Sequence, residues 1–377
     1  MAIENKKVVL IDPATAGLNG LYLESYINAC PENIIPISNY HDPFKRKYKY
    51  FFKYSDLAVQ HVFKLGFLRL PIRFFEMLTG LCRTFFKIIQ IKPAAVVYCL
   101  SSNLFLELFL LILLRVLRYD VYIVCHDVIP FVGKNESLGI KSFKRNLFYM
   151  LANKLIVHNE GSIKELKEHF NINEDKIYYL PFPNCDLNKY KALVNKDINY
   201  EPTNIRRYLF IGHMRIEKGI NILLQAWKKF SEDKEDVKLI LAGNLVSDID
   251  RSIIDTNPSI ELHSEYLTDN KYFEMINSSD LVIFPYIRGT NSAVLSNVVS
   301  LSKLIIVSDI NMFMKSGLVP ENSYFHSEDS ESLCMSLNNS YIMDSAEILR
   351  NQNILKHLKS SRDELFKDTL ITLIEEI

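Results

Sequence analysis

Two basic side chains lie between two glycines in the short segment 212–219. An apolar run ends at Gly212 and a helical pattern begins near Gly219, so Arg215 and Lys218 lie where a strand turns into a helix. The free amides of a helix N-terminus favour an anion, and two fixed cations beside them suit a nucleotide diphosphate, both for binding and for stabilising its departure. The alternative is a solvated turn with two surface cations.

Hydroxyl and amide side chains begin a second helical pattern in the same half of the chain. Thr290, Asn291 and Ser292 follow an apolar run that ends at Pro285. Each of the three is a good N-cap for purely structural reasons. The same free amides bind phosphate oxygens if the helix start turns toward a ligand. Because both segments follow the carboxyl ends of strands in one domain, each strengthens the phosphate-site hypothesis for the other.

A histidine and an aspartate end an apolar run in the first half of the chain. His126 and Asp127 directly follow Cys125, at the edge where parallel sheets bind ligands. A histidine at a strand end is often only a hydrogen-bonded structural group. We expect a functional role for His126, while Asp127 is either the base of an inverting displacement or a group that orients the loop.

Short apolar runs alternate with helical patterns along the chain. The runs are continuous, as parallel strands buried on both faces require. The first series of predicted strands is Val8–Ile11, Ala95–Cys99, Val121–Cys125, Leu155–His158 and Ile177–Leu180. The second series is Tyr208–Ile211, Val237–Ala242, Ile260–His263, Leu281–Pro285 and Leu304–Ser308. The sequence therefore predicts an α/β protein with two doubly wound parallel sheets.

A polar stretch from Asn184 to Asn204 separates the two series and is typical of an interdomain connection. We expect one domain over residues 1–184 and a second over residues 185–354. The charged helical pattern at the end of the chain, about residues 355–377, is expected to pack back on the first domain.

The ordered motifs of the second half resemble those of the group 1, or family-four, nucleotide-sugar glycosyltransferases. They are G-H-M-R-I-E-K-G at 212–219, I-N-I-L-L-Q-A-W after it, L-A-G at 241–243, E-Y-L-T-D at 265–269, S-S-D-L-V-I-F-P-Y at 278–286 and G-T-N-S-A-V-L at 289–295. The set spans roughly residues 206 to 312 and is specific in combination. The first half resembles the family less closely, through C-H-D-V-I-P-F at 125–131. The resemblance implies the GT-B fold, in which two Rossmann-like domains face each other across a cleft.

The resemblance also implies a role for each matched position of the second domain, which would bind the donor. Arg215 and Lys218 would hold the donor diphosphate, and Gly212 would allow close backbone approach. The remaining donor positions are Glu265, Tyr266 and Leu267 at the nucleobase, and Thr290, Asn291 and Ser292 at the distal phosphate and sugar.

The first domain would then bind the acceptor. His126 would lie near the transferred sugar or the attacking hydroxyl, and Gly17 and Gly20 occupy the place of the family's glycine-rich acceptor-side loop. Members of the family are mostly retaining. In that case the donor phosphate itself can deprotonate the acceptor, and no protein base is required.

Two positions depart from the family pattern. Many members carry two glutamates eight positions apart, and Gly289 and Asn297 stand in their places here. Asn297 can still hydrogen-bond a ribose hydroxyl, but as a neutral group. A subgroup with a T-x-S-x-V-L loop also lacks the first glutamate.

The composition excludes several other classes of protein. The 377 residues carry 44 basic and 44 acidic side chains, and this zero net charge argues against a general nucleic-acid binder. The six cysteines are scattered, which argues against a structural zinc site and a disulfide framework and fits a reducing cytosol. No Asp or His cluster is spaced as a metal site near either phosphate motif, so we expect no metal and no cofactor besides the donor sugar nucleotide.

Basic and aromatic residues interleave over residues 44–92, which we call the basic aromatic segment. It has eleven lysines and arginines against two acids, Asp56 and Glu76. Cationic heads with aromatic bodies suit an anionic membrane surface. The alternative is a pair of amphipathic core helices with a basic outer face. We find no export signal, and the longest apolar run, Leu104–Leu117, carries two charges and is too short to span a bilayer.

These patterns predict a metal-independent glycosyltransferase at the inner face of the cytoplasmic membrane. It would move a sugar from a UDP- or GDP-linked donor to a saccharide or polyprenyl-diphosphate-linked acceptor, in the synthesis of a bacterial capsule, O-antigen or exopolysaccharide. Two alternatives remain open. One is a degenerate GT-B subunit that only supports another transferase, and the other is a nucleotide-sugar epimerase of the same fold.

Overall fold

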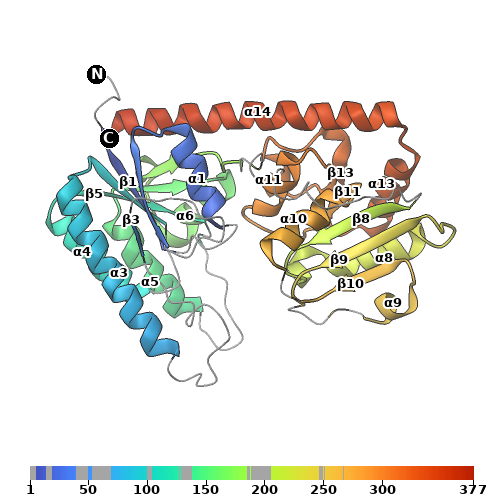
Figure 1. Cartoon of the computed structure of the whole chain (residues 1–377), viewed down its shortest axis with the longest axis horizontal. Coiled ribbons are helices and arrows are strands. Elements are labelled where there is room, and N and C mark those ends of the chain that lie inside the picture. Colours follow the sequence, from blue (N-terminus) through green and yellow to red (C-terminus); the bar gives the residue numbers. More distant parts are fainter. Residues whose placement is uncertain are drawn as a thin grey trace. The chain divides into compact units, whose positions relative to one another are not determined.

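A computed structural model shows the chain as two units (Figure 1). The first comprises Met1–Pro183 with Leu365–Ile377, and the second comprises Asn184–Glu364. The described residues are 6–13, 19–39, 50–52, 69–99, 104–126, 128, 138–184, 187, 205–245, 249, 251–265 and 267–377. The predicted positions Gly17, Asp127 and Tyr266 and most of the basic aromatic segment lie outside them.

The first unit is built on a parallel sheet of seven strands in the order β3-β2-β1-β4-β5-β6-β7. Every printed pairing between neighbouring strands is parallel. Its strands are β1 (Val8–Asp12), β2 (Ile34–Asn39), β3 (Tyr50–Phe52), β4 (Ala95–Cys99), β5 (Asp120–Val124), β6 (Lys154–Val157) and β7 (Ile177–Tyr179). All residues of β1 and β4 are buried, because helices cover both faces of the sheet.

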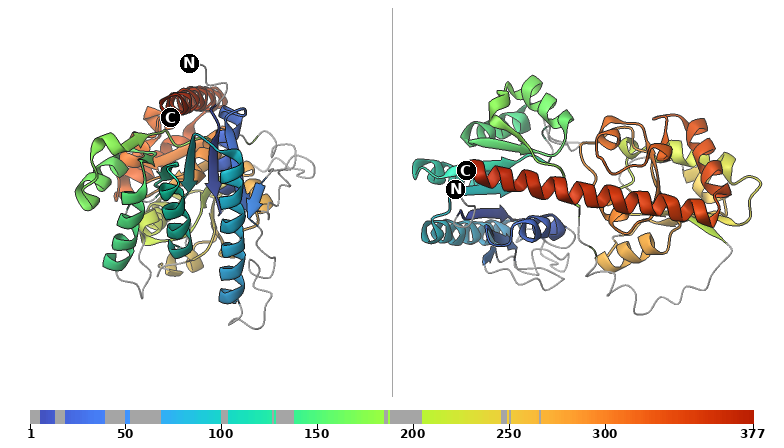
Figure 2. Two further views of the ribbon diagram at one scale, coloured as in Figure 1. Left: turned by 90° about the vertical axis from the view of Figure 1, so that its left-hand side faces the viewer. Right: turned by 90° about the horizontal axis from the view of Figure 1, so that it is seen from above.

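Two layers of helices cover this sheet (Figure 2). On one face, α3 (Arg69–Ile91), α4 (Leu104–Val116), α5 (Leu138–Leu151) and α6 (Glu160–Phe170) share a core with β1, β4, β5 and β6. On the other face, α1 (Asn19–Ala29) packs with the end of α14 (Ser345–Glu376). The long helix α14 begins in the second unit, and Phe366, Leu370 and Leu373 near its end join the core of the first.

The second unit repeats the architecture with six parallel strands in the order β10-β9-β8-β11-β12-β13. Its strands are β8 (Arg206–Ile211), β9 (Val237–Ala242), β10 (Ile260–His263), β11 (Leu281–Phe284), β12 (Leu304–Ser308) and β13 (Tyr324–Phe325). Its helices are α8 (Ile220–Phe230), α9 (Arg251–Thr256), α10 (Asp269–Asn277), α11 (Ala293–Ser300), α12 (Asn311–Met314) and α13 (Ser330–Ile342). On α8 the buried Leu223, Trp227 and Phe230 recur at helical spacing and pack on the sheet.

The predicted fold class, two doubly wound α/β domains, is confirmed. All ten predicted strands are present with shifts of at most two residues at their ends. The sequence reading missed β2, β3 and β13. Strand β2 contains Pro36 and ends in Ser38 and Asn39, while β3 and β13 are only three and two residues long. Among the described helices, none is long and apolar enough to cross a membrane.

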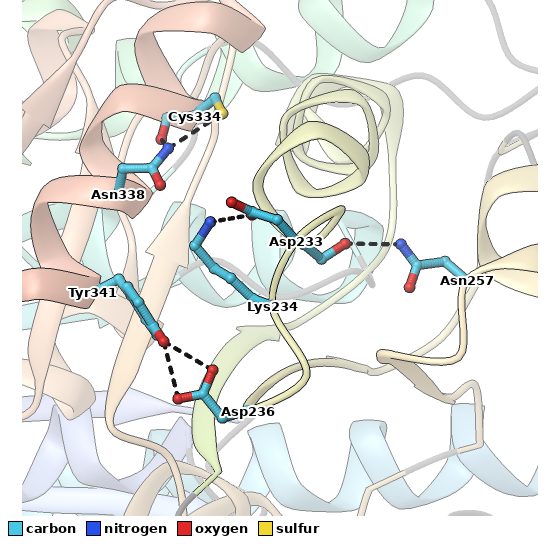
Figure 3. A network of polar contacts seen from close by, with 8 residues as sticks. Asp233, Lys234, Asp236, Asn257, Cys334, Asn338 and Tyr341 are labelled. Atoms are coloured by element: carbon cyan, nitrogen blue, oxygen red, sulfur yellow. Dashed lines mark hydrogen bonds and ion pairs between the residues drawn. The ribbon is translucent and has the colours of Figure 1, made fainter.

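A groove of about 1180 Å³ lies at the amino ends of the strands of the second sheet, where Ile205, Val237 and Ser259 contribute to its wall. Figure 3 shows polar contacts in this region: Lys234 pairs with Asp233, and Tyr341 donates to Asp236 at 2.9 Å. Several lysines of the groove already have acidic partners, including Lys229 with Glu331, Lys234 with Asp233 and Lys238 with Glu261. The groove is therefore poorly suited to an anionic ligand.

Candidate functional site

The order of strands in the second sheet identifies its ligand-binding edge. The chain leaves β8 toward β9 and later returns to pair β11 with the opposite side of β8. In open parallel sheets, ligands bind beyond the carboxyl ends of the strands where the winding reverses. The segments 212–219 after β8 and 285–292 after β11 both begin at this point.

Two glycines shape the backbone at the carboxyl ends of β8 and β9. Gly212 has a φ of +131° and Gly243 a φ of +130°, a region that residues with a Cβ rarely adopt. A Cβ on Gly243 would overlap the carbonyl oxygen of Gly212, whereas a Cβ on Gly212 would meet open space. Gly212 therefore leaves an open place where a ligand can approach the backbone closely.

The segments after β8 and β11 are in direct contact. Gly219 has a φ of +67°, and a Cβ added to it would overlap the carbonyl oxygen of Pro285. The backbone amide of Ile287 donates to the carbonyl of Glu217 at 2.9 Å, and the Arg288 guanidinium pairs with the Glu217 carboxylate at 3.0 Å. A hydrogen bond from the backbone, followed by the hydrogen bond from Arg288, lowers the pKa of Glu217. Glycine at 219 thus lets the two predicted phosphate segments touch.

Lys218 is held against an aromatic ring that comes from the other segment. Its Nζ atom lies 3.6 Å from the centre of the Tyr286 ring, a cation–π geometry. Tyr286 is 2% exposed, and burial raises the pKa of its hydroxyl to about 12. Ser308 donates to the Tyr286 carbonyl at 2.5 Å, and Ser292 hydrogen-bonds its hydroxyl. The Tyr286 ring therefore holds the ammonium group of Lys218, and its hydroxyl contacts Ser292 at the N-cap of α11.

Arg215 and Lys218 create a positive field that affects the pKa of the neighbouring His213. Partial desolvation, together with repulsion from Arg215 and Lys218, lowers the pKa of His213. The Nε atom of Arg215 is buried and has no hydrogen-bond partner among the described residues. The two cations thus lie close enough to His213 to disfavour a further positive charge, an arrangement that would favour an anionic ligand.

The residues before α11 form its N-terminal cap. The side chain of Ser292 accepts a hydrogen bond from the Leu295 amide at 3.2 Å. Thr290 and Asn291 precede it and are half-buried. The structural role expected of a cap residue is thus filled by Ser292. The Ser292 side chain accepts from only one backbone amide of the first turn, so the other amides of that turn can still donate to a ligand.

Asn297 lies one turn further along α11 and is 3% exposed. Its Nδ2 donates to the Tyr272 hydroxyl at 3.2 Å, and its Oδ1 has no hydrogen-bond partner among the described residues. Gly289 is exposed, and a Cβ there would come within 3.0 Å of the Met312 sulfur.

Glu265 and Leu267 follow β10, at the same edge of the sheet. Glu265 is exposed and pairs with Nδ1 of His263 at 3.5 Å, while Nε2 of His263 contacts Glu261 at 2.6 Å. The His263 carbonyl accepts from the Gly243 amide at 2.8 Å, which connects this edge of the sheet to the paired glycines. The predicted donor residues that the structure describes thus lie at one edge of the second unit.

His126 lies in the first unit within a cluster of aromatic and imidazole rings. Its ring packs edge-on against Tyr22 at 4.7 Å and lies 5.5 Å from His158. Nδ1 of His158 donates to the Leu180 carbonyl at 2.9 Å, so in the neutral ring Nε2 accepts from the Tyr22 hydroxyl, 2.9 Å away. The Tyr26 hydroxyl lies 2.6 Å from that of Tyr22. Burial raises the pKa of both tyrosines.

The sequence reading named only His126 and Gly20 among the described residues of this region. It missed His158 and Tyr22, although one signal was present. His158 ends the run after β6, and β6 pairs with β5, which precedes His126. Adjacent parallel strands bring their carboxyl ends together, so two histidines following them are expected to be neighbours. Gly20 is buried in the first turn of α1.

The described residues contain no group of three or more His, Cys, Asp or Glu side chains that could hold a metal ion.

The contact between Gly219 and Pro285 predicts an unusually costly substitution. Gly219→Ala combines backbone strain with overlap of the Pro285 carbonyl. Gly317→Ala is a matched control, because Gly317 also has a φ of +67° but nothing within 4 Å of an added Cβ. Chemical denaturation should show a loss of roughly 1–2 kcal/mol for the control and clearly more for Gly219→Ala. Equal losses would show that the contact does not constrain the loop.

Comparisons with known proteins agree with this geometry. Residues 205–338 match the family model described as glycosyl transferases group 1. No curated protein sequence matches the chain. Similar solved structures include a trehalose-6-phosphate synthase, OtsA, with 10% identity and a TM-score of 0.67 over 99% of both chains.

A glycosyltransferase from Rickettsia africae ESF-5 has 14% identity and a TM-score of 0.67 over 99% of this chain and 98% of its own. Anabaena HepE, solved with UDP and glucose, has 14% identity and a TM-score of 0.65 over 99% of both chains. At such identities these structures establish the fold alone. The chain therefore has the GT-B fold, and its residues 205–338 resemble the group 1 glycosyl transferases.

Proposed function

We propose that the chain transfers a sugar from a UDP-linked donor, with the diphosphate bound where β8 and β11 end. The observation that carries the proposal is the contact of the two segments at the point where the winding of the sheet reverses. There Arg215, Lys218 and the start of α11 would meet one anion. The uridine nucleotides in the solved HepE complexes support uridine over guanosine as the base.

Charge stabilisation would be the main contribution of these residues. Cleavage of the bond between the sugar and the diphosphate leaves negative charge on the departing phosphate. Arg215 and Lys218 would neutralise that charge, and Tyr286 would keep Lys218 in place. In retaining transfer the departing phosphate oxygen would take the proton of the attacking hydroxyl, so no protein base is needed. Glu265 and Leu267 would contact the uracil, and Thr290, Asn291 and Ser292 the distal phosphate and sugar.

The acceptor site would belong to the first unit, with His126 beside the reacting hydroxyl and Gly17 and Gly20 on the acceptor side. We propose a saccharide acceptor carried on a lipid diphosphate, in bacterial surface polysaccharide synthesis at the inner face of the cytoplasmic membrane. The basic aromatic segment motivates this choice. A non-catalytic partner subunit is the second candidate, because Gly289 and Asn297 replace two glutamates common in the family. Hydrolysis of UDP-sugars by the purified chain would exclude it.

Removing either cation should weaken donor binding without unfolding the chain. A charge-assisted hydrogen bond to phosphate contributes roughly 1.5–3 kcal/mol, so Arg215→Ala and Lys218→Ala should each raise the Kd for UDP about ten- to a hundred-fold. Lys228→Ala is the control, since Lys228 lies on α8 at the opposite end of the sheet. Isothermal titration calorimetry with UDP measures the Kd of all three variants. Wild-type affinity in both site variants would remove the phosphate site.

The pKa of His213 should report the charge of the site. Desolvation and the two cations hold this pKa below the ordinary value of a histidine in the free protein. A bound diphosphate adds negative charge nearby and should raise the pKa, while Arg215→Ala should raise it in the absence of ligand. An NMR titration of the His213 ring checks both. A His213 pKa that UDP leaves unchanged would place the diphosphate elsewhere.

A further inference from the structure

Large apolar side chains are exposed on the outside of the helix layer formed by α3, α4 and α5. The most exposed are Phe75 (63%), Phe86 (69%), Phe109 (63%), Val116 (73%), Phe143 (64%) and Met150 (66%). Scattered exposed apolar residues are ordinary, but this number on three neighbouring helices is not. We call this surface the α3–α5 face.

The helical spacing explains why these residues share one side of the layer. All three helices pack on the same face of the first sheet, and α4 contacts both α3 and α5. Residues two positions apart on a helix point in nearly opposite directions. Five of the six residues lie two positions from a buried one, as in the pairs Phe75 with Met77, Val116 with Leu114 and Met150 with Phe148. The apolar residues therefore point away from the core.

The same three helices are strongly basic. Among the side chains that the structure describes, they carry five lysines and arginines (Arg83, Lys87, Arg115, Lys144 and Arg145) and two glutamates. Glu107 is fully buried, so its carboxylate does not reach the surface. Arg83 lies on the exposed side of α3 between Phe75 and Phe86, and Lys87 follows it. The surface combines apolar rings with cations and little negative charge.

We propose that the α3–α5 face docks on an anionic lipid surface, with its phenylalanines inserted among the acyl chains and its cations at the phosphates. Such a surface takes up both kinds of side chain at once. A symmetric dimer through this face would bring like cations together. The inference deepens the proposed lipid-linked acceptor, and it differs from the basic aromatic segment because α4 and α5 contribute phenylalanines from outside that segment.

Vesicle co-sedimentation of the full chain tests the proposal. The wild type should bind vesicles that contain phosphatidylglycerol far more than vesicles of phosphatidylcholine alone, and raised salt should release it. The triple variant Phe75→Ser, Phe86→Ser and Phe109→Ser should bind at least ten-fold more weakly. A matched control replaces Met335, Ile342 and Leu349, which are 67%, 77% and 55% exposed in the second unit, with serine and should bind as the wild type does.

A conservative variant measures insertion directly. The single tryptophan of the chain, Trp227, is fully buried, so Phe109→Trp adds one exposed reporter. Its fluorescence should shift to the blue when anionic vesicles are added. An unshifted spectrum would overturn the proposal, and so would equal sedimentation of the wild type and the triple serine variant. The proposal would also fail if light scattering showed a dimer that the triple serine variant dissociates. UDP titration of the same samples distinguishes a failure of this proposal from a failure of the proposed donor site, because donor binding needs no membrane.

Discussion

The close approach of the Gly219 backbone to the Pro285 carbonyl is the constraint on which the candidate site depends. It permits the hydrogen bond from the Ile287 amide to the Glu217 carbonyl and the ion pair between Arg288 and Glu217. The same closeness places Lys218 over the Tyr286 ring. A side chain at position 219 would separate the segments, and cations and helix amides would no longer meet one ligand.

The polarity of the parallel sheet divides the second unit into two functionally different ends. At the carboxyl ends of the strands, glycines open the backbone, and the charges of Arg215 and Lys218 depress the pKa of His213. At the amino ends, Lys229, Lys234 and Lys238 pair with acidic residues around a groove of about 1180 Å³. The positive field of Arg215 and Lys218 at the carboxyl ends is the feature that supports the proposed donor site.

Much of the fold could be predicted from the sequence, because continuous apolar strands and amphipathic helices such as α8 are local patterns. The sequence also identified the segments 212–219 and 285–292, since glycine, cations and cap residues at strand ends are local as well. The missed features depend on tertiary contacts. Strand β13 has only two residues and is defined by its pairing with β12. The Lys218–Tyr286 contact joins residues 68 positions apart in the sequence, and the His158–Tyr22 contact joins residues 136 positions apart.

A crystal structure of the chain with UDP tests the central claim most directly. We predict that the diphosphate oxygens lie within hydrogen-bonding distance of Arg215 and Lys218, next to Gly212 and the first turn of α11. Gly219 and Pro285 should keep their contact, because the site is formed before the ligand binds. A diphosphate bound in the groove beside Lys229 and Lys234, or anywhere in the first unit, would contradict the account.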